Sequence, residues 1–227
     1  MDREVALFIQ NLEQKKVMTK ASMTFYSGSF DGSKTVVVKC GVGKVNAAMC
    51  TQILIDIFEP DAIICTGIAG ALSPDLDIGD TVISSDVVQY DVDSTGFGHE
   101  LGEIPNLGKK YFKASQQIID MAVKVHKDYF RENKFFVGRI LTGDQFVSSK
   151  DKTEMLRRTF NGLCVEMEGG AIGQVCYLNN TPFVIIRTIS DKADGSAITD
   201  YEKFADVTAN KSFHIVSGIV KLLKLKE

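Results

Sequence analysis

The chain has 227 residues, 44% of them hydrophobic, and a formal net charge of −3 with both signs mixed along its length. This length suffices for one well-buried domain, so we expect residues 1–227 to form a single domain. The sequence has no basic stripe, no apolar run long enough to cross a bilayer and no amino-terminal signal peptide, which argues against a nucleic-acid or membrane partner.

The first half of the chain alternates predicted strands with a helix. A strand is predicted over residues 35–40 and a helix over residues 44–58, with Val45, Ala48, Met49 and Ile53 on its apolar face. Strands follow over residues 62–65 and 81–88. The polar, glycine-rich segment 91–108 is predicted to be a long functional loop.

The second half continues the alternation. It contains predicted helices over residues 114–129, 149–159 and 169–177, and predicted strands over residues 136–141, 163–165 and 183–186. The last helix carries Phe213, Val216, Val220 and Leu223 at helical spacing and is expected to cover the sheet. Strands alternating with helices predict an α/β fold in three layers, with a mixed, mostly parallel central sheet flanked by helices.

Cysteine and histidine usage bears on compartment and metal binding. The five cysteines lie mostly within apolar segments and form no Cys-x-x-Cys pair, which indicates reduced thiols in a cytoplasmic protein. The three histidines are scattered and lack metal-ligand spacing, so no metal site is expected.

Acidic residues follow two of the predicted strands. Glu166 and Glu168 come directly after residues 163–165, and Asp191 comes just past the apolar run Phe183–Ile186. Ligands of open α/β sheets settle beyond the carboxyl ends of the strands, so two acids meeting there suggest a site that breaks a bond by proton transfer and charge stabilisation. Taken singly, Asp191 is better explained as a turn cap and Glu168 as a first-turn helix acid.

Three further motifs have alternative interpretations. The run Gly41–Val45 lacks the spacing of a Walker loop or of a dinucleotide fingerprint, and is interpreted as a strand-to-helix turn. The run Thr66–Ala71 fits a tight turn and a close ligand approach about equally. Phe146 by itself is best explained as core, but beside the carboxylates it is a candidate for stacking on a flat heterocycle whose edge the Val147 backbone reads.

Together these segments resemble the 5′-methylthioadenosine/S-adenosylhomocysteine nucleosidases of the nucleoside phosphorylase superfamily. The resemblance covers essentially the whole chain in order, through residues 1–5, 41–45, 66–70, 94–98, 143–147, 165–168 and 187–194. It implies a nucleoside phosphorylase-like fold, a homodimer, a small-molecule nucleoside substrate and no metal or organic cofactor. The family's first β-strand has no counterpart before Met1, and we expect the natural chain to start upstream.

The resemblance implies that Asp191, oriented by Ser190, is the general acid that protonates purine N7 as adenine leaves. Asp191 must then hold a proton near neutrality, which burial favours. Glu168 would bind the ribose hydroxyls and offset the oxocarbenium charge, with Met167 packing beside the sugar. Glu4 would position the attacking water.

Further residues are implied to form the walls of the nucleoside site. Phe146 would stack on adenine, and the Val147 backbone would bind its edge. Phe97 would enter the pocket that the partner subunit forms for the 5′-substituent. The other implied pocket residues are Ala69, Gly70, Met1 and Tyr201.

The implied reaction hydrolyses the N-glycosidic bond of 5′-methylthioadenosine and S-adenosylhomocysteine to adenine and the thio-ribose, with 5′-deoxyadenosine as a further candidate substrate. Many relatives carry serine where this chain has Ile68, and an isoleucine there favours water over phosphate as the nucleophile. A purine nucleoside phosphorylase and a non-catalytic nucleoside-binding protein remain as alternatives. The sequence does not distinguish methylthio, homocysteinyl, deoxy and aminofutalosine-type 5′-groups.

Overall fold

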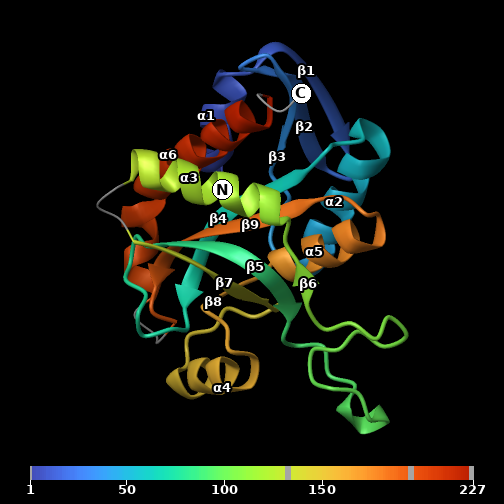
Figure 1. The fold of residues 1–227 in the computed structure, drawn as a ribbon, viewed down its shortest axis with the longest axis vertical. Helices are drawn as coiled ribbons and strands as arrows, with labels where there is room; N and C mark the ends of the chain where they lie inside the picture. The colour runs from blue at the N-terminus through green and yellow to red at the C-terminus, as the bar shows by residue number, and fades with distance from the viewer. Residues whose placement is uncertain (1, 131–133, 194–196, 225–227) are drawn as a thin grey trace.

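The computed structural model describes residues 2–130, 134–193 and 197–224, with the side chains of residues 2–4 and 197–207 left aside. Helices and strands alternate along the chain (Figure 1). In chain order the elements are α1 (Asp2–Gln10), β1 (Glu13–Lys20), β2 (Met23–Phe30), β3 (Ser33–Val38), α2 (Lys44–Phe58), β4 (Ile63–Ala71), β5 (Thr81–Gln89), the 3₁₀ helix η1 (Thr95–Phe97), β6 (Phe112–Lys113), α3 (Gln116–Tyr129), β7 (Phe135–Thr142), α4 (Lys150–Phe160), β8 (Cys164–Glu166), α5 (Gly169–Leu178), β9 (Phe183–Asp191) and α6 (Ala197–Lys224).

The central sheet has the strand order β6-β5-β7-β8-β4-β9 and is mixed. Its two longest ladders, β4–β9 and β5–β7, are parallel, whereas the antiparallel pairings β4–β8, β5–β6 and β5–β9 each join only two or three residue pairs. Because β5 pairs with β9 as well as with β7, the strands β5, β7, β8, β4 and β9 close on themselves. The predicted mixed, mostly parallel sheet is confirmed.

Helices cover both faces of this sheet, as predicted. On one face α3 and α6 pack on β5 and β9, and on the other α2 and α5 pack together over β4, β5 and β7. The run at residues 183–186 is buried on both faces, since Ile185 joins the core beneath α2 and α5 while Val184 and Ile186 join the core beneath α3 and α6. Such a strand reads as continuously apolar because neither face meets water.

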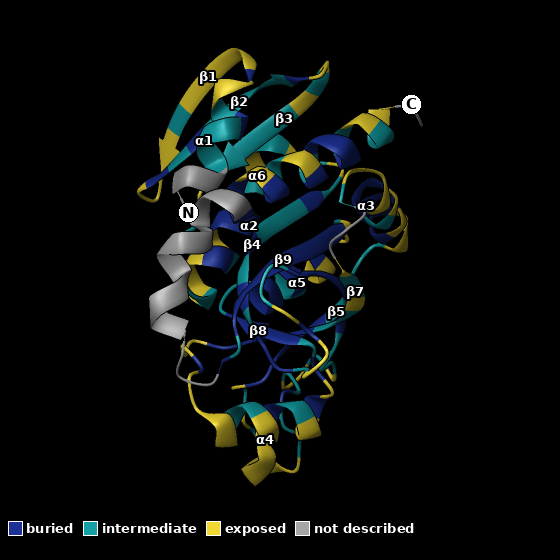
Figure 2. Ribbon diagram, turned by 90° about the vertical axis from the view of Figure 1, so that its left-hand side faces the viewer, coloured by how far each residue is buried: buried dark blue, intermediate teal, exposed yellow. Residues whose placement is uncertain are grey.

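The strand predicted near residues 35–40 lies outside the central sheet. It is β3 of a separate three-stranded antiparallel sheet, whose other strands, β1 and β2, the sequence patterns did not predict. Strand β1 is largely exposed at the edge of the molecule, whereas Phe25 of β2 packs on Cys50 and Ile53 of α2 (Figure 2). An exposed edge strand shows little apolar alternation, which explains why it was missed.

Two helices present other faces than expected. Helix α2 buries Ala47, Cys50, Thr51 and Ile53, while Val45 is 78% exposed. Apolar side chains occur all around this helix, so its periodicity does not select a face. In α6 the predicted Leu223 packs on the core beneath the central sheet together with Ile215 and Ile219. The other predicted residues, Phe213, Val216 and Val220, pack instead on the cluster of Phe8, Leu12 and Phe30, which α1, the turn after it and the small sheet supply.

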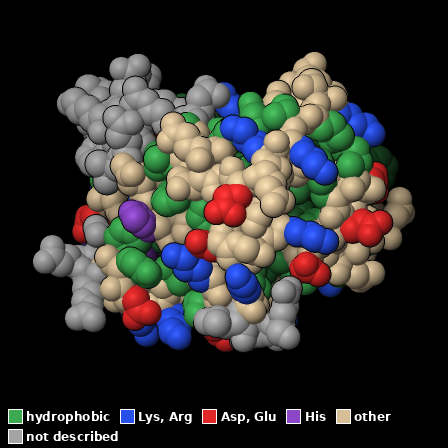
Figure 3. Space-filling view, turned by 90° about the horizontal axis from the view of Figure 1, so that it is seen from above, with side chains coloured by type: hydrophobic (Ala, Val, Ile, Leu, Met, Phe, Trp, Pro, Cys, Tyr) green, Lys and Arg blue, Asp and Glu red, His purple; other side chains and the backbone are tan. Residues whose placement is uncertain are grey.

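The segment between β5 and β6 is the long loop predicted from composition, and it projects from the body of the molecule (Figure 1). On the face drawn in Figure 3, cationic and anionic side chains are interspersed rather than gathered into separate patches. Among the described helices, none is long and apolar enough to cross a membrane.

One buried histidine makes the packing of α3 sensitive to pH. The His126 side chain is fully buried, its ring centroid lies 5.4 Å from that of Phe130 and 5.1 Å from that of Phe135, and Nε2 has no hydrogen-bond partner among the described residues. Burial, assisted by the positive charge of Lys211, lowers the pKa of His126 from 6.5 to about 4. The folded protein therefore binds fewer protons than the unfolded chain between these two values.

It follows that the free energy of unfolding falls as the pH drops from about 6.5 to about 4. Replacing His126 by leucine removes this proton uptake. Over that interval the free energy of unfolding of the wild-type protein should therefore fall by up to about 3 kcal/mol more than that of His126→Leu. Urea unfolding at pH 7, 5.5 and 4 measures the difference. His214→Gln, at an exposed position of α6, serves as the control, and parallel pH profiles for wild type and His126→Leu would contradict the assignment.

Candidate active site

Asp191, the last residue of β9, is buried and held at both carboxylate oxygens. The Ser190 hydroxyl donates a hydrogen bond of 2.8 Å to Oδ2, and the backbone N–H of Ala193 donates one of 2.8 Å to Oδ1. Two donors on one carboxylate fix its orientation and offer charge-assisted hydrogen bonds whenever it is ionised. Ser190 also lies 3.4 Å from the carbonyl oxygen of Ala69.

A β-bulge aims Asp191 at Gly70. The parallel ladder pairs Ala69 with Ile189 and then Gly70 with Asp191, so Ser190 is the extra residue. A Cβ at position 70 would lie 3.0 Å from Asp191 Oδ1 and 3.0 Å from the Ala193 side chain, so glycine leaves the space that the carboxylate needs. The run Thr66–Ala71 therefore belongs to strand β4, and its interpretation as a tight turn is wrong.

Glu168 stands where the amino end of α5 meets the amino end of α2. The backbone N–H of Gly43 donates a 2.9 Å hydrogen bond to Oε1, and Arg187 Nη2 lies 3.4 Å from Oε2. Burial raises the pKa of the Glu168 carboxyl, opposed by the charge of Arg187 and reinforced by that of Glu166. With 17% of its side chain exposed, Glu168 remains within reach of a ligand. A carboxylate with a raised pKa is a stronger hydrogen-bond acceptor than an ordinary one.

Glu166, two residues earlier, points inward. It forms an ion pair with Arg187 in which both side chains are 2% exposed, and it accepts a hydrogen bond from the Thr142 hydroxyl. The N–H groups of Gly169 and Glu168 complete its shell at 2.8 to 3.0 Å. Every lone pair of this carboxylate is engaged, so Glu166 has none left for a ligand.

Arg187 is the residue that sequence reasoning overlooked. It pairs with Gly67 across the β4–β9 ladder, and a Cβ at Gly67 would overlap its guanidinium. Burial by itself lowers the pKa of Arg187, but attraction by Glu166, Cys65 and Glu168 raises it well above the ordinary value, so the charge persists. A cation inside the apolar run 183–189 was the available signal, because arginine is almost never fully buried without partners.

The short strand β8 brings the turn that carries Glu168 beside β4, which also pairs with the strand that carries Asp191. Gly70 of β4 pairs with Asp191 on one side and with Val165 of β8 on the other. Strand β8 runs antiparallel to β4 and ends at Glu166, so residues 167 and 168 turn off beside the middle of β4. Asp191 thus ends β9 and Glu168 follows the end of β8, so both acids stand at carboxyl ends of strands, although β8 and β4 run in opposite directions.

Some of the remaining predicted residues lie within the described part of the chain and others lie outside it. Phe146 is 61% exposed while Val147 is buried, so Phe146 is not a core residue. Met167 is partly buried beside Glu168, and Phe97 in the long loop is 90% exposed. Met1 and the side chains of Glu4 and Tyr201 lie outside the described residues. Over the described parts of the chain, no group of three or more His, Cys, Asp or Glu side chains is arranged to hold a metal ion.

Comparison with known proteins decides the family. The model of the Phosphorylase superfamily matches residues 1–221. The chain is 42% identical over 221 residues to the 5′-methylthioadenosine/S-adenosylhomocysteine nucleosidase of Halalkalibacterium halodurans, covering 97% of this chain and 94% of that protein. This chain belongs to the 5′-methylthioadenosine/S-adenosylhomocysteine nucleosidases of the phosphorylase superfamily.

Solved nucleosidase structures share the fold. The Neisseria meningitidis nucleosidase, in complex with methylthio-immucillin-A, superposes with a TM-score of 0.93 at 36% identity, covering 97% of this chain and 95% of that one. The Colwellia psychrerythraea nucleosidase, in complex with adenine, gives 0.92 at 37% identity, covering 97% and 91%. The resemblance and the nucleoside phosphorylase-like fold expected from the sequence are therefore confirmed. The roles of individual site residues remain predictions.

In this nucleosidase the buried pair Glu166–Arg187 should dominate local stability. Glu166→Ala leaves a guanidinium buried without its main partner, so we expect a loss of about 3–5 kcal/mol in the free energy of unfolding. Urea unfolding near pH 7 measures it. The matched control is Glu154→Ala, which removes the exposed i,i+4 pair with Arg158 and should cost about 1 kcal/mol or less. Equal losses in the two variants would contradict the structural role of Glu166.

Proposed function

We propose that this chain hydrolyses the N-glycosidic bond of 5′-methylthioadenosine and S-adenosylhomocysteine, releasing adenine and the thio-ribose. The observation that carries the proposal is the buried, doubly hydrogen-bonded carboxylate of Asp191, lying across Gly70 from the strand that leads to Glu168. Nucleosidases of this name are about 40% identical over nearly the whole chain, and the related structures hold adenine or a methylthio-immucillin.

Asp191 acts as the general acid. Adenine is a poor leaving group as an anion, so transfer of a proton to N7 lowers the barrier to bond cleavage. The transfer leaves a carboxylate, and the Ser190 hydroxyl and the Ala193 N–H are already in place to stabilise it. Because these donors need no reorganisation during the reaction, they favour the transition state more than the ground state.

Glu168 binds the ribose in this proposal. As the glycosidic bond lengthens, the ribose gains positive charge, and a carboxylate bound to its hydroxyls compensates that charge. The Gly43 N–H and Arg187 hold Glu168 from behind, which leaves its exposed part for the substrate. Met167, partly buried beside it, supplies an apolar contact for the ribose.

The base half of the site is the segment 143–147. Phe146 offers an exposed flat face on which adenine stacks, and the Val147 backbone reads the polar edge of the ring. Ala69 and Gly70 line the side nearest Asp191.

Water is the nucleophile in this proposal. Ile68 lies within β4 beside Ala69 and offers no hydroxyl for a phosphate ion. Glu4 positions the water, and Met1 and Tyr201 contact the sugar; all three remain predictions. We also propose the cytoplasm as the compartment, since all five cysteines are free thiols and burial raises the pKa of Cys50 to about 12.

A homodimer completes the site in this proposal. Val42 in the turn before α2 and Val45 and Met49 in the helix are exposed and form an apolar patch at its amino end, next to the Gly43 that holds Glu168. An exposed apolar patch of this kind is typical of a protein–protein contact. Phe97 is 90% exposed on the projecting loop, positioned to enter the 5′-substituent pocket of a second subunit.

The Asp191→Asn variant tests the acid. An amide cannot protonate N7, so kcat should fall by about 100-fold to 10,000-fold while the dissociation constant for the nucleoside changes little. Chromatographic detection of free adenine from 5′-methylthioadenosine measures kcat. Retention of more than a tenth of the wild-type kcat would refute the assignment. Assays in phosphate-free buffer separate the alternatives: a phosphorylase would stall there, and a binding protein would release no adenine in any buffer.

The Val45→Lys variant tests the dimer. A charge placed in the apolar patch should convert a dimer into a monomer of 25.0 kDa, as measured by light scattering. Val17→Lys is the control, because Val17 is exposed on β1, outside the proposed interface, and the variant should stay dimeric. A dimeric Val45→Lys protein, or a monomeric wild type, would contradict the proposed interface.

A further inference from the structure

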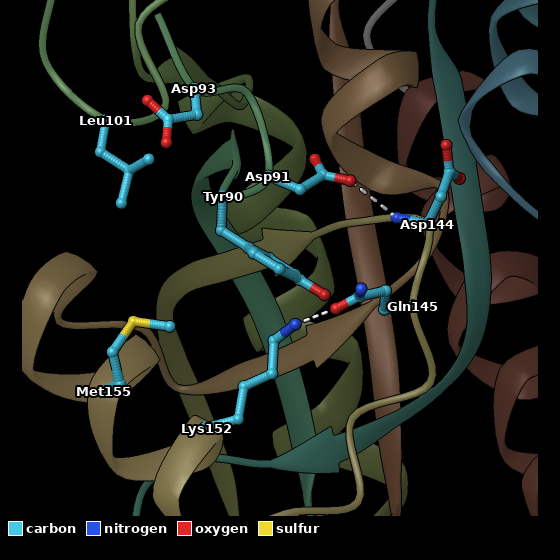
Figure 4. Close-up of a pocket in the computed structure, with 8 residues that line it drawn as sticks. All are labelled: Tyr90, Asp91, Asp93, Leu101, Asp144, Gln145, Lys152 and Met155. Carbon is cyan, nitrogen blue, oxygen red and sulfur yellow. Dashed lines mark hydrogen bonds between the residues drawn. The ribbon is translucent and has the colours of Figure 1, made fainter. Parts of the chain in front are cut away.

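Asp91, at the carboxyl end of β5, joins two segments through its two carboxylate oxygens. Oδ1 lies 2.6 Å from Lys44 Nζ at the first residue of α2, and Oδ2 accepts a 2.9 Å hydrogen bond from the backbone N–H of Asp144. Figure 4 shows the second of these contacts, with Asp91 reaching toward the segment that follows β7. One side chain thus ties the start of α2 to the start of the segment 143–147.

The side chain of Asp144 contacts the amino end of α2 in return. The Asp144 side chain accepts a 2.8 Å hydrogen bond from the backbone N–H of Lys44, and the preceding N–H, that of Gly43, donates to Glu168. Two consecutive N–H groups at the amino end of one helix therefore bind two carboxylates, where such groups have no partner within the helix. In the proposed function Glu168 belongs to the sugar half of the site, and Asp144 belongs to the base half.

Little apolar packing supports the segment 143–147 on its outer side. A cavity of about 450 Å³ lies there, lined by Tyr90, Asp91, Asp93, Leu101, Asp144, Gln145, Lys152 and Met155 (Figure 4). Gln145 and Phe146 are exposed, and only Val147 is anchored in the core. At its start the Tyr90 ring lies against Gly143, where any Cβ would overlap the ring. Polar contacts therefore set the position of this segment: Asp91 accepts from the Asp144 N–H at its start, and Lys152 donates to Gln145 further along.

We propose that Asp91 is a positioning residue which, with Lys44 and Asp144, sets the separation between Glu168 and Phe146–Val147. The inference rests on the proposed function, since it takes those residues as the sugar and base contacts. A nucleoside spans both halves at once, whereas adenine alone uses only the base half. Asp91 should therefore affect the binding and turnover of ligands that bridge the two halves. Small displacements between bound groups lower the reaction rate strongly.

The test compares Asp91→Ala with Met155→Ala. Met155 lines the same cavity from α4 and is 45% exposed, so its variant should keep wild-type activity. Asp91→Ala should lower kcat with 5′-methylthioadenosine at least about tenfold. It should also weaken binding of a non-hydrolysable 5′-methylthio nucleoside analogue about tenfold or more, while adenine binds within about twofold of wild type.

The ratio of nucleoside to adenine affinity is the deciding readout, because general destabilisation would weaken both ligands alike. The double variant Lys44→Met/Asp91→Ala should lose no more than the worse single variant, since the two side chains form one contact. Should Asp91→Ala fail to fold, Asp91→Asn replaces it: the amide keeps one oxygen for the Asp144 N–H, loses the charge attraction to Lys44, and should shift the affinity ratio in the same direction by less.

An unchanged affinity ratio in the Asp91 variant that folds, or an equal loss in Met155→Ala, would overturn the role of Asp91 without bearing on the nucleosidase activity itself. Failure of the proposed function is separate and visible in the wild type, which would then release no adenine from the nucleoside in phosphate-free buffer.

Discussion

The site depends on one buried ion pair, between Arg187 of β9 and Glu166 of β8. Both side chains are withdrawn from water, and such a pair is tolerated only when further hydrogen bonds complete it. The Thr142 hydroxyl and the N–H groups at the start of α5 complete the Glu166 carboxylate, and Gly67 leaves room for the guanidinium, whose Nε has no hydrogen-bond partner among the described residues. Four strands and one helix are thereby held in a single geometry, and the position of Glu168 follows from it.

Three acidic residues near this pair have different roles because their surroundings differ. Glu166 is saturated with partners and stabilises the fold. Glu168 is held by one amide and the far side of Arg187, and stays partly exposed, so it can bind a ligand. Asp191 receives a hydroxyl and an amide donor, and no cation is among its recorded contacts. The roles proposed for these acids follow from their environments, not from residue type.

The amino end of α2 links these roles to assembly. Its first amides bind Glu168 and Asp144, and its exposed apolar side chains, Val45 and Met49, lie within two turns of the same end. A partner subunit seated on that patch would press on the turn that holds Glu168, the proposed sugar ligand. Under the proposed function, substrate binding and subunit contact are therefore expected to be coupled through one helix end, which Asp91 connects to the segment 143–147.

Much of the fold was predictable from sequence because local burial leaves a local pattern. The helix over residues 44–58, the doubly buried strand at 183–186 and the placement of Asp191 at a strand end all follow from periodicity and apolar runs. The exposed strand β1 and the buried face of α2 did not, since the first has weak alternation and the second is apolar all round. Nor could periodicity tell the inward Glu166 from the outward Glu168, because their partners come from β9 and from the turn before α2.

By itself the sequence determined the alternation of elements and the acids available to the site. Only the tertiary structure decided that the hydrogen-bonding capacity of Glu166 is filled, that Glu168 stays partly exposed and which segments Asp91 joins. Those outcomes depend on contacts between residues far apart in the chain.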